Sequence, residues 1–156
     1  MCEYCGCQSL SVIAELTAEH DRLRDLGRAL AEAADAHDLT RARALSRAMR
    51  DVLGPHTAVE EGGLFPAMTG DFPDQIGALT GEHREIDSGL DLDAAQDGWP
   101  DRVHAVLATL FEHILKEQDG VFPASLTTLS ARDWEDVAAV RRSAGPEHSG
   151  QRVRLT

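Results

Sequence analysis

Apolar residues recur at steps of three and four along most of the 156-residue chain. In residues 10–36 this row consists of Ile13, Leu16, His20, Leu23, Gly27, Leu30 and Ala34. Similar rows cross residues 40–67, 74–90 and 100–122, and runs of β-branched residues are absent. This spacing places one apolar stripe on each of four helices, which must be buried against one another. The sequence therefore predicts an all-α fold.

The connections between the four segments are short, which makes neighbouring helices antiparallel. We expect an up-down-up-down four-helix bundle. Thr40 is predicted to cap the second helix, and Pro73 and Pro100 suit the first turns of the third and fourth helices. Pro66 and Pro123 lack the N–H that would bond four residues back, so the second and fourth helices should bend or stop there.

The region after the bundle carries one further helix signal. Ser130 and Asp133 form a capping-box pattern, which predicts a short C-terminal fifth helix over about 131–142. We divide the chain into a Cys-containing N-terminal tail (1–9), a four-helix bundle (10–124) and a C-terminal helix with a flexible tail (125–156).

Three cysteines, Cys2, Cys5 and Cys7, lie in the N-terminal tail. An odd number of cysteines in a tail is not a disulfide framework. The pattern also lacks the fourth thiolate of a usual zinc or iron–sulfur site. Two interpretations stay open, namely a tail with exposed thiols and a segment with metal or redox chemistry.

The charge balance bounds the partners of this protein. Lys and Arg number 15 against 27 Asp and Glu, a formal net charge of −12, which repels phosphate backbones and anionic lipid. No segment approaches the ~20 apolar residues of a membrane span. The first residues lack the basic region and apolar core of a signal peptide. We expect a cytoplasmic protein that binds neither nucleic acid nor membranes.

A twelve-residue string occurs twice, as HTAVEEGGLFPA at 56–67 and as HILKEQDGVFPA at 113–124. The two copies share six identities, including a His-x-x-x-Glu pair. Side chains four residues apart are neighbours on one face of a helix. The repeat therefore predicts one half of a site that two duplicated hairpins each supply.

Four of the seven histidines fall on the apolar stripes, one in each predicted helix. The first two lie 18 residues on either side of Asp38, and the other two lie 15 residues on either side of Gly98. In an antiparallel hairpin, equal distance from the turn means equal height along the axis. The imidazoles should therefore meet the two repeated carboxylates in one layer of the core. This predicted layer consists of His20, His56, Glu60, His83, His113 and Glu117.

Such a layer predicts a metal site. Burying six polar side chains without partners costs on the order of several kcal/mol for each group, and a bound metal ion removes this cost. Two ions ~3.5–4 Å apart, bridged by two carboxylates with imidazoles at either end, fit the number of side chains better than one ion. Imidazole and carboxylate suit iron, with manganese and zinc as less favoured alternatives.

The order of these residues on four helices, over about residues 10–124, resembles the hemerythrin-like HHE cation-binding family. This resemblance implies a non-haem centre of two iron ions with an oxygen atom bridging them. It also implies that one iron is bound by His20 and His56, the other by His83 and His113, and that Glu60 and Glu117 bridge the two.

Two positions depart from the oxygen-carrying members of that family. Their fifth histidine is replaced by Asp87, which is a possible additional ligand. Their aspartate five residues after the last histidine is replaced by Gln118, and this chain offers Glu117 instead. Each iron then has an open position, which favours reaction with small oxidants over reversible carriage of oxygen.

We therefore predict a di-iron protein that binds or turns over a small diatomic or peroxide ligand. Hydrogen peroxide is the leading substrate, in a catalase-like disproportionation or a reduction. Two alternatives remain. One is a module that binds or senses oxygen or nitric oxide. The other is iron storage or donation for the repair of metal centres, because the ligand pattern also resembles the iron-centre repair proteins of this family.

Several polar residues near the predicted ligands are assigned smaller roles. Glu19 and Glu82 each precede a predicted ligand histidine, which we attribute to duplication and solvation. Glu61 and Asp119 are interpreted either as groups that hold ligand histidines from outside or as exposed charges.

Expectations also follow for two phenylalanines and for the three histidines outside the predicted layer. Phe65 and Phe122 are expected to close the apolar cage below the metals. We expect His37, His104 and His148 to lie on the exposed surface.

Overall fold

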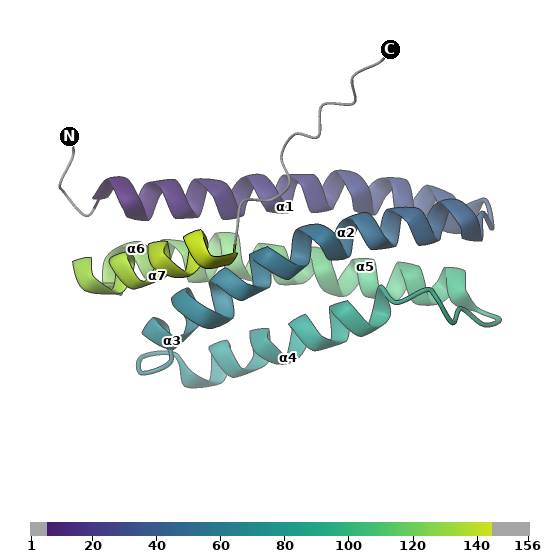
Figure 1. The fold of residues 1–156 in the computed structure, drawn as a ribbon. Helices are drawn as coiled ribbons and strands as arrows, with labels where there is room; N and C mark the ends of the chain where they lie inside the picture. The colour runs from purple at the N-terminus through teal and green to yellow at the C-terminus, as the bar shows by residue number, and fades with distance from the viewer. Residues whose placement is uncertain (1–5, 145–156) are drawn as a thin grey trace, which may run out of the picture.

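Four helical rods lie side by side, and a shorter helix packs along them (Figure 1). The computed structural model describes residues 6–144, with side chains from Ser9 onward. The elements are α1 (Gly6–Asp35), α2 (Leu39–Val59), η1 (Glu60–Leu64), α3 (Phe65–Met68), α4 (Pro73–Gly89), α5 (Trp99–Lys116), η2 (Glu117–Val121), α6 (Phe122–Thr128) and α7 (Ala131–Ala144). No strand occurs in residues 6–144, which confirms the predicted all-α bundle with a short C-terminal helix.

Most of the predicted helix ends are confirmed. Pro73 and Pro100 lie in the first turns of α4 and α5, where a missing N–H costs nothing. At the start of α7, the Ser130 N–H donates to the Asp133 carboxylate at 2.8 Å, and the Asp133 N–H donates to the Ser130 hydroxyl at 3.2 Å. This reciprocal pair is the predicted capping box.

One prediction about helix ends is wrong. The cap of α2 is Asp38 rather than Thr40, because α2 begins at Leu39 and the Asp38 carboxylate accepts a 3.0 Å hydrogen bond from the Arg41 N–H. Of the two outcomes predicted at Pro66 and Pro123, a bend or a stop, the stop does not occur. Each proline lies in the first turn of a new α-helical segment, α3 or α6, which needs no donor from it.

Each copy of the repeated string contains a π-turn, which explains how the rods continue through these prolines. The Phe65 N–H donates to the Glu60 carbonyl, and the Phe122 N–H donates to the Glu117 carbonyl, five residues back rather than four. In such a turn, residues i and i+5 take the relative places that i and i+4 have in an α-helix. Each phenylalanine therefore follows its glutamate on the inner face of the rod.

The apolar core is divided into two clusters by a polar layer. The cluster toward the α1–α2 turn includes Leu23, Met49, Ile86 and Leu110, and the other includes Leu16, Val59, Leu79 and Phe122. His20 lies between Leu16 and Leu23 along α1, at the boundary of the two clusters. Each buried leucine contributes roughly 1.5–3 kcal/mol, so the polar layer is held between two strongly stabilising regions.

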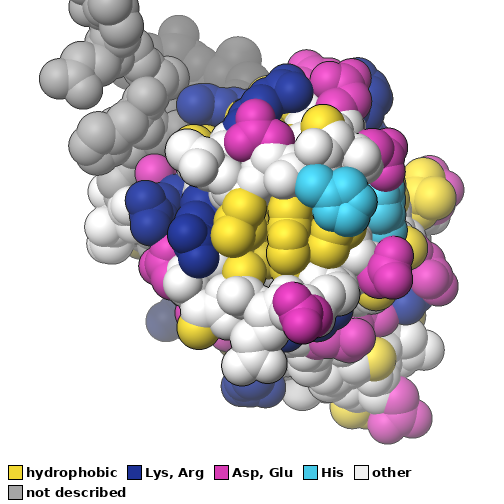
Figure 2. Space-filling model, turned by 90° about the vertical axis from the view of Figure 1, so that its right-hand side faces the viewer, with side chains coloured by type: hydrophobic (Ala, Val, Ile, Leu, Met, Phe, Trp, Pro, Cys, Tyr) yellow, Lys and Arg dark blue, Asp and Glu magenta, His cyan; other side chains and the backbone are white. Residues whose placement is uncertain are grey.

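Figure 2 shows the end of the molecule formed by the α1–α2 turn and the α4–α5 loop, where histidine and hydrophobic side chains lie on the surface among acidic ones. His104 and His37 are both exposed at this end. His104 pairs with Asp35 at 2.8 Å, and the His37 ring meets Trp99 edge-on. The expected exposure of these two histidines is confirmed, and His148 lies outside the described residues.

Helix α7 covers one side of the second cluster. It packs against α1, α2 and η1 and buries Trp134 and Val137. Gly63 in η1 permits this approach, because a Cβ atom there would lie 3.1 Å from the Val137 Cα. Gly120 has the same position in the second copy of the string, and a Cβ there would meet no atom within 4 Å. The equivalent site in the second half is therefore open.

The open site is an apolar groove of about 640 Å³ between α4 and the η2–α6 segment. Its walls include Phe72, Ile76, Leu79, Val121 and Ala124, with Glu82 and Lys116 also on the lining. The two halves of the bundle thus have equivalent helices. They differ because α7 covers η1 in the first half, whereas an apolar groove lies beside η2 in the second half.

Leucine at Gly63 and at Gly120 should have unequal effects on stability. Gly63→Leu forces a side chain into the α7 backbone, and such overpacking costs roughly 1–3 kcal/mol. Gly120→Leu enters open space, so we expect its unfolding free energy to change by less than about 1 kcal/mol. Thermal and urea unfolding of both variants measures the difference. Equal losses would show that α7 does not rest on Gly63.

Candidate metal centre

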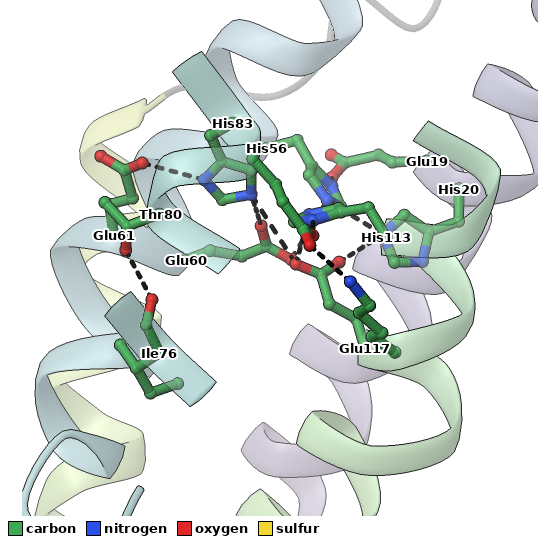
Figure 3. A network of polar contacts seen from close by, with 12 residues as sticks. Glu19, His20, His56, Glu60, Glu61, Ile76, Thr80, His83, His113 and Glu117 are labelled. Atoms are coloured by element: carbon green, nitrogen blue, oxygen red, sulfur yellow. Dashed lines mark hydrogen bonds and ion pairs between the residues drawn. The ribbon is translucent and has the colours of Figure 1, made fainter. Parts of the chain in front are cut away.

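The six side chains of the predicted layer converge in the core of the bundle (Figure 3). They come from all four rods, and none of the six residues is more than 7% exposed. Their ligand atoms form two groups, each within 4.8 Å. The groups are His20, His56, Glu60 and Glu117, and Glu60, His83, His113 and Glu117. We call these six residues the His/Glu cluster.

Both glutamates belong to both groups because each directs one oxygen to each. Glu60 places Oε1 at 3.1 Å from His56 Nε2 and Oε2 at 3.1 Å from His83 Nε2. Glu117 repeats this arrangement, with Oε2 at 3.0 Å from one Nε2 atom and Oε1 at 2.7 Å from another. Each carboxylate therefore spans the two halves of the bundle in the way a bridging ligand does.

Most polar atoms at the centre of the cluster lack hydrogen bonds, apart from the Nε2 atoms of His20 and His56, which lie 3.1 Å from each other. All four oxygens of Glu60 and Glu117, and the Nε2 atoms of His83 and His113, are buried without a hydrogen-bond partner. They lie within ion-pair distance of one another, but their angles do not suit hydrogen bonds. Buried polar atoms of this kind are costly unless a cation binds them. The imidazole and carboxylate donors thus fit a metal ion such as iron, manganese or zinc.

Glu19 holds a histidine of the cluster from outside. Its Oε2 lies 2.7 Å from His56 Nδ1, and its Oε1 lies 2.7 Å from the Arg141 guanidinium of α7. Glu19 is only 2% exposed. The attribution of Glu19 to solvation is therefore wrong. Carboxylates on the outer nitrogen of a ligand histidine fix the ring and its tautomer.

Glu82 repeats this role in the second half, so its assignment to solvation is also wrong. Its Oε2 lies 2.7 Å from His113 Nδ1, and its other oxygen accepts from Lys116. Glu61 lies 2.9 Å from His83 Nδ1, so it holds a histidine of the cluster from outside and is not merely an exposed charge. Asp119 is exposed.

The surroundings of the cluster favour positive charge on His56. Burial lowers the pKa of His56, but Glu60 and Glu19 more than reverse this and raise it to about 10. Burial raises the pKa of Glu19, but its hydrogen bonds to His56 and Arg141 prevail and lower it, which keeps the carboxylate ionised. A site that stabilises a proton on its imidazoles in this way also attracts a metal cation.

Two aromatic rings lie against the cluster, as expected for an apolar cage. Phe65 stacks on His83, with ring centroids 5.6 Å apart, and Phe122 stacks on His20 at 5.4 Å. Each phenylalanine reaches a histidine of the other hairpin. The π-turns therefore align these rings with the imidazoles across the core.

Asp87 does not join the His/Glu cluster. Its carboxylate is exposed and pairs with Arg50 at 3.0 Å, and neither ligand group includes it. Cys2, Cys5 and the side chain of Cys7 lie outside the described residues.

Comparison with known proteins agrees with this geometry. The sequence model of the hemerythrin HHE cation binding domain matches residues 11–125, a span that contains the whole His/Glu cluster. No curated protein and no solved structure matched the chain. Within residues 6–144, no helix has both the length and the apolar character needed to cross a bilayer. Because the match covers most of its length, the chain belongs to the hemerythrin HHE cation-binding family.

Proposed function

We propose that the His/Glu cluster binds two iron ions with an oxygen atom between them. One ion is assigned to His20 and His56, the other to His83 and His113, and both to Glu60 and Glu117. The observation that carries this proposal is the division of each carboxylate, which sends one oxygen to each pair of histidines. Asp87 is not among the proposed ligands, since it pairs with Arg50.

The proposed substrate is a small oxidant, most favourably hydrogen peroxide in a catalase-like reaction. Bound iron ions supply the redox chemistry, and the chain holds the ligands and limits water. The site is enclosed by apolar clusters on both sides and by Phe65 and Phe122. Such an enclosure suits a molecule of very few atoms.

The open groove supports approach from the α4 side. It is lined by Glu82, which bonds directly to His113. The Glu82 side chain is 18% exposed, whereas that of Glu19 is 3% exposed beneath α7. We therefore propose that a small ligand reaches the centre beside the Glu82–Lys116 pair.

One observation favours a second candidate function, the sensing of oxygen or nitric oxide. Arg141 connects α7 to Glu19, and Glu19 connects to His56 in the cluster. A ligand that shifts His56 would thereby act on α7. A change in α7 on ligand binding, without turnover, distinguishes a sensor from an enzyme.

Iron-supplied protein should contain close to two iron atoms per chain and absorb in the near ultraviolet. Glu60→Ala or Glu117→Ala should lose much of the second ion, because each glutamate contacts both groups. Glu112→Ala removes an exposed glutamate of α5 and serves as the control. Metal analysis and absorption spectra measure the result. Zinc as the sole metal under ample iron would contradict the iron assignment, and full occupancy in Glu60→Ala would contradict the bridge.

Removal of the metal should lower the thermal stability of the protein. An ion that binds only the folded state, at about 100 times its Kd, adds ~2.7 kcal/mol. For a chain of this size, that corresponds to roughly 5–10 °C in Tm. Melting before chelation, after chelation and after iron is restored measures the effect. Identical melting temperatures would show that the cluster tolerates the absence of metal.

Addition of hydrogen peroxide to the iron-loaded protein should release one molecule of oxygen for every two of peroxide consumed. An oxygen electrode follows the reaction, and Glu112→Ala should keep the rate while Glu117→Ala loses most of it. Consumption without oxygen release would indicate reduction instead. If peroxide is not consumed but oxygen or nitric oxide changes the absorption spectrum, the result would contradict the enzymatic function and support the sensing function.

A further inference from the structure

The four histidines of the His/Glu cluster differ at their outer nitrogen, Nδ1. Three have a carboxylate there, in the pairs His56 with Glu19, His113 with Glu82 and His83 with Glu61, at 2.7, 2.7 and 2.9 Å. The fourth, His20, is 0% exposed, and its Nδ1 has no hydrogen-bond partner. One of the two histidine pairs thus lacks a carboxylate that the other pair has.

The internal repeat identifies the residue responsible. Glu61 directly follows Glu60 in the first copy of the string, and Gln118 directly follows Glu117 in the second. Glu61 reaches across to a histidine of the other hairpin. Gln118 also reaches the other hairpin, but its Oε1 accepts a 2.7 Å hydrogen bond from Arg24. Gln118 therefore occupies the position from which a carboxylate would serve His20.

A second pair of matching positions, Arg24 and Asp87, also differs between the two halves. Arg24 lies four residues after His20 on α1, and Asp87 holds the corresponding place after His83 on α4. Asp87 pairs with Arg50, and the Glu61 carboxylate bonds to His83. Arg24 instead donates to the Gln118 carbonyl, and His20 Nδ1 has no hydrogen-bond partner.

Building on the proposed di-metal function, we infer that Gln118 makes the two metal positions unequal. A carboxylate on Nδ1–H strengthens the other ring nitrogen as a ligand, and loss of such a partner typically costs about 10–100-fold in metal affinity. The position held by His20 and His56 therefore binds its ion more weakly than the position held by His83 and His113. The first ion therefore binds at the His83–His113 position, and the second ion binds at the His20–His56 position.

The chain itself shows that one carboxylate can serve a cation and a histidine together. Glu19 divides its oxygens between Arg141 and His56, and Glu82 divides its oxygens between Lys116 and His113. A glutamate at position 118 can likewise keep the contact with Arg24 while its second oxygen serves His20. The exchange Gln118→Glu thus tests the inference without removing an existing ion pair.

The experiment is an anaerobic titration of metal-free full-length protein with Fe²⁺ against a competing chelator. The wild-type chain should bind two ions in steps separated by about 10–100-fold in Kd. Gln118→Glu should narrow this gap by strengthening the weaker step about 10-fold, and Glu61→Gln should narrow it by weakening the stronger step. Leu115→Glu adds the same charge at an exposed position of α5 and should leave both steps unchanged.

The outcomes separate this inference from the proposed function. Two ions of equal affinity in the wild-type chain, or a weaker step that Gln118→Glu and Leu115→Glu alter equally, would overturn the inference and leave the di-metal centre intact. Binding of a single ion by every variant would overturn both. Matching circular dichroism and melting temperatures of the metal-free variants verify that the substitutions act on the site.

Discussion

The bundle depends on two buried carboxylates that each face two histidines. Glu60 and Glu117 are fully buried, and their oxygens point to opposite halves of the cluster. Ionised carboxylates are stable in a core only when positive charge surrounds them, so the four rods must meet at one height. The apolar clusters above and below then enforce that height through packing. The outer carboxylates and their cations, such as Arg141 on Glu19, fix the imidazoles that complete the charge balance.

Much of this arrangement was predictable because helical geometry is periodic. Equal distances from the turns placed the histidines at one level, and the four-residue spacing placed each glutamate beside its histidine. The π-turns were missed because one extra residue breaks the period, although the five-residue step from Glu60 to Phe65 was visible. Glu19 was misjudged because sequence neighbours on a helix point in different directions: His20 enters the cluster while Glu19 supports His56. Arg141 carried no signal, since it belongs to α7, outside the repeat.

The two halves of the cluster are built alike and finished differently. In the first half, α7 covers η1 and buries Glu19, whereas the second half has an apolar groove and a more accessible Glu82. The partners of the histidines also differ between the halves. His83 has Glu61 at Nδ1, while His20 has no hydrogen-bond partner at Nδ1. A symmetric core thus lies within an asymmetric shell, and under the proposed function that asymmetry makes the two metal positions unlike.

The two π-turns indicate which features of the chain are older than its internal duplication. Both copies of the string carry the same five-residue turn at the same place, from Glu60 and from Glu117. The simplest account is that the extra residue was already present when one ancestral hairpin gave rise to two. Gln118 and Arg24 differ from Glu61 and Asp87 at the matching positions, and within residues 6–144 no helix packs on Gly120 as α7 packs on Gly63, so these differences arose after the duplication. The residues of the His/Glu cluster that both halves share are then older than the differences between the halves.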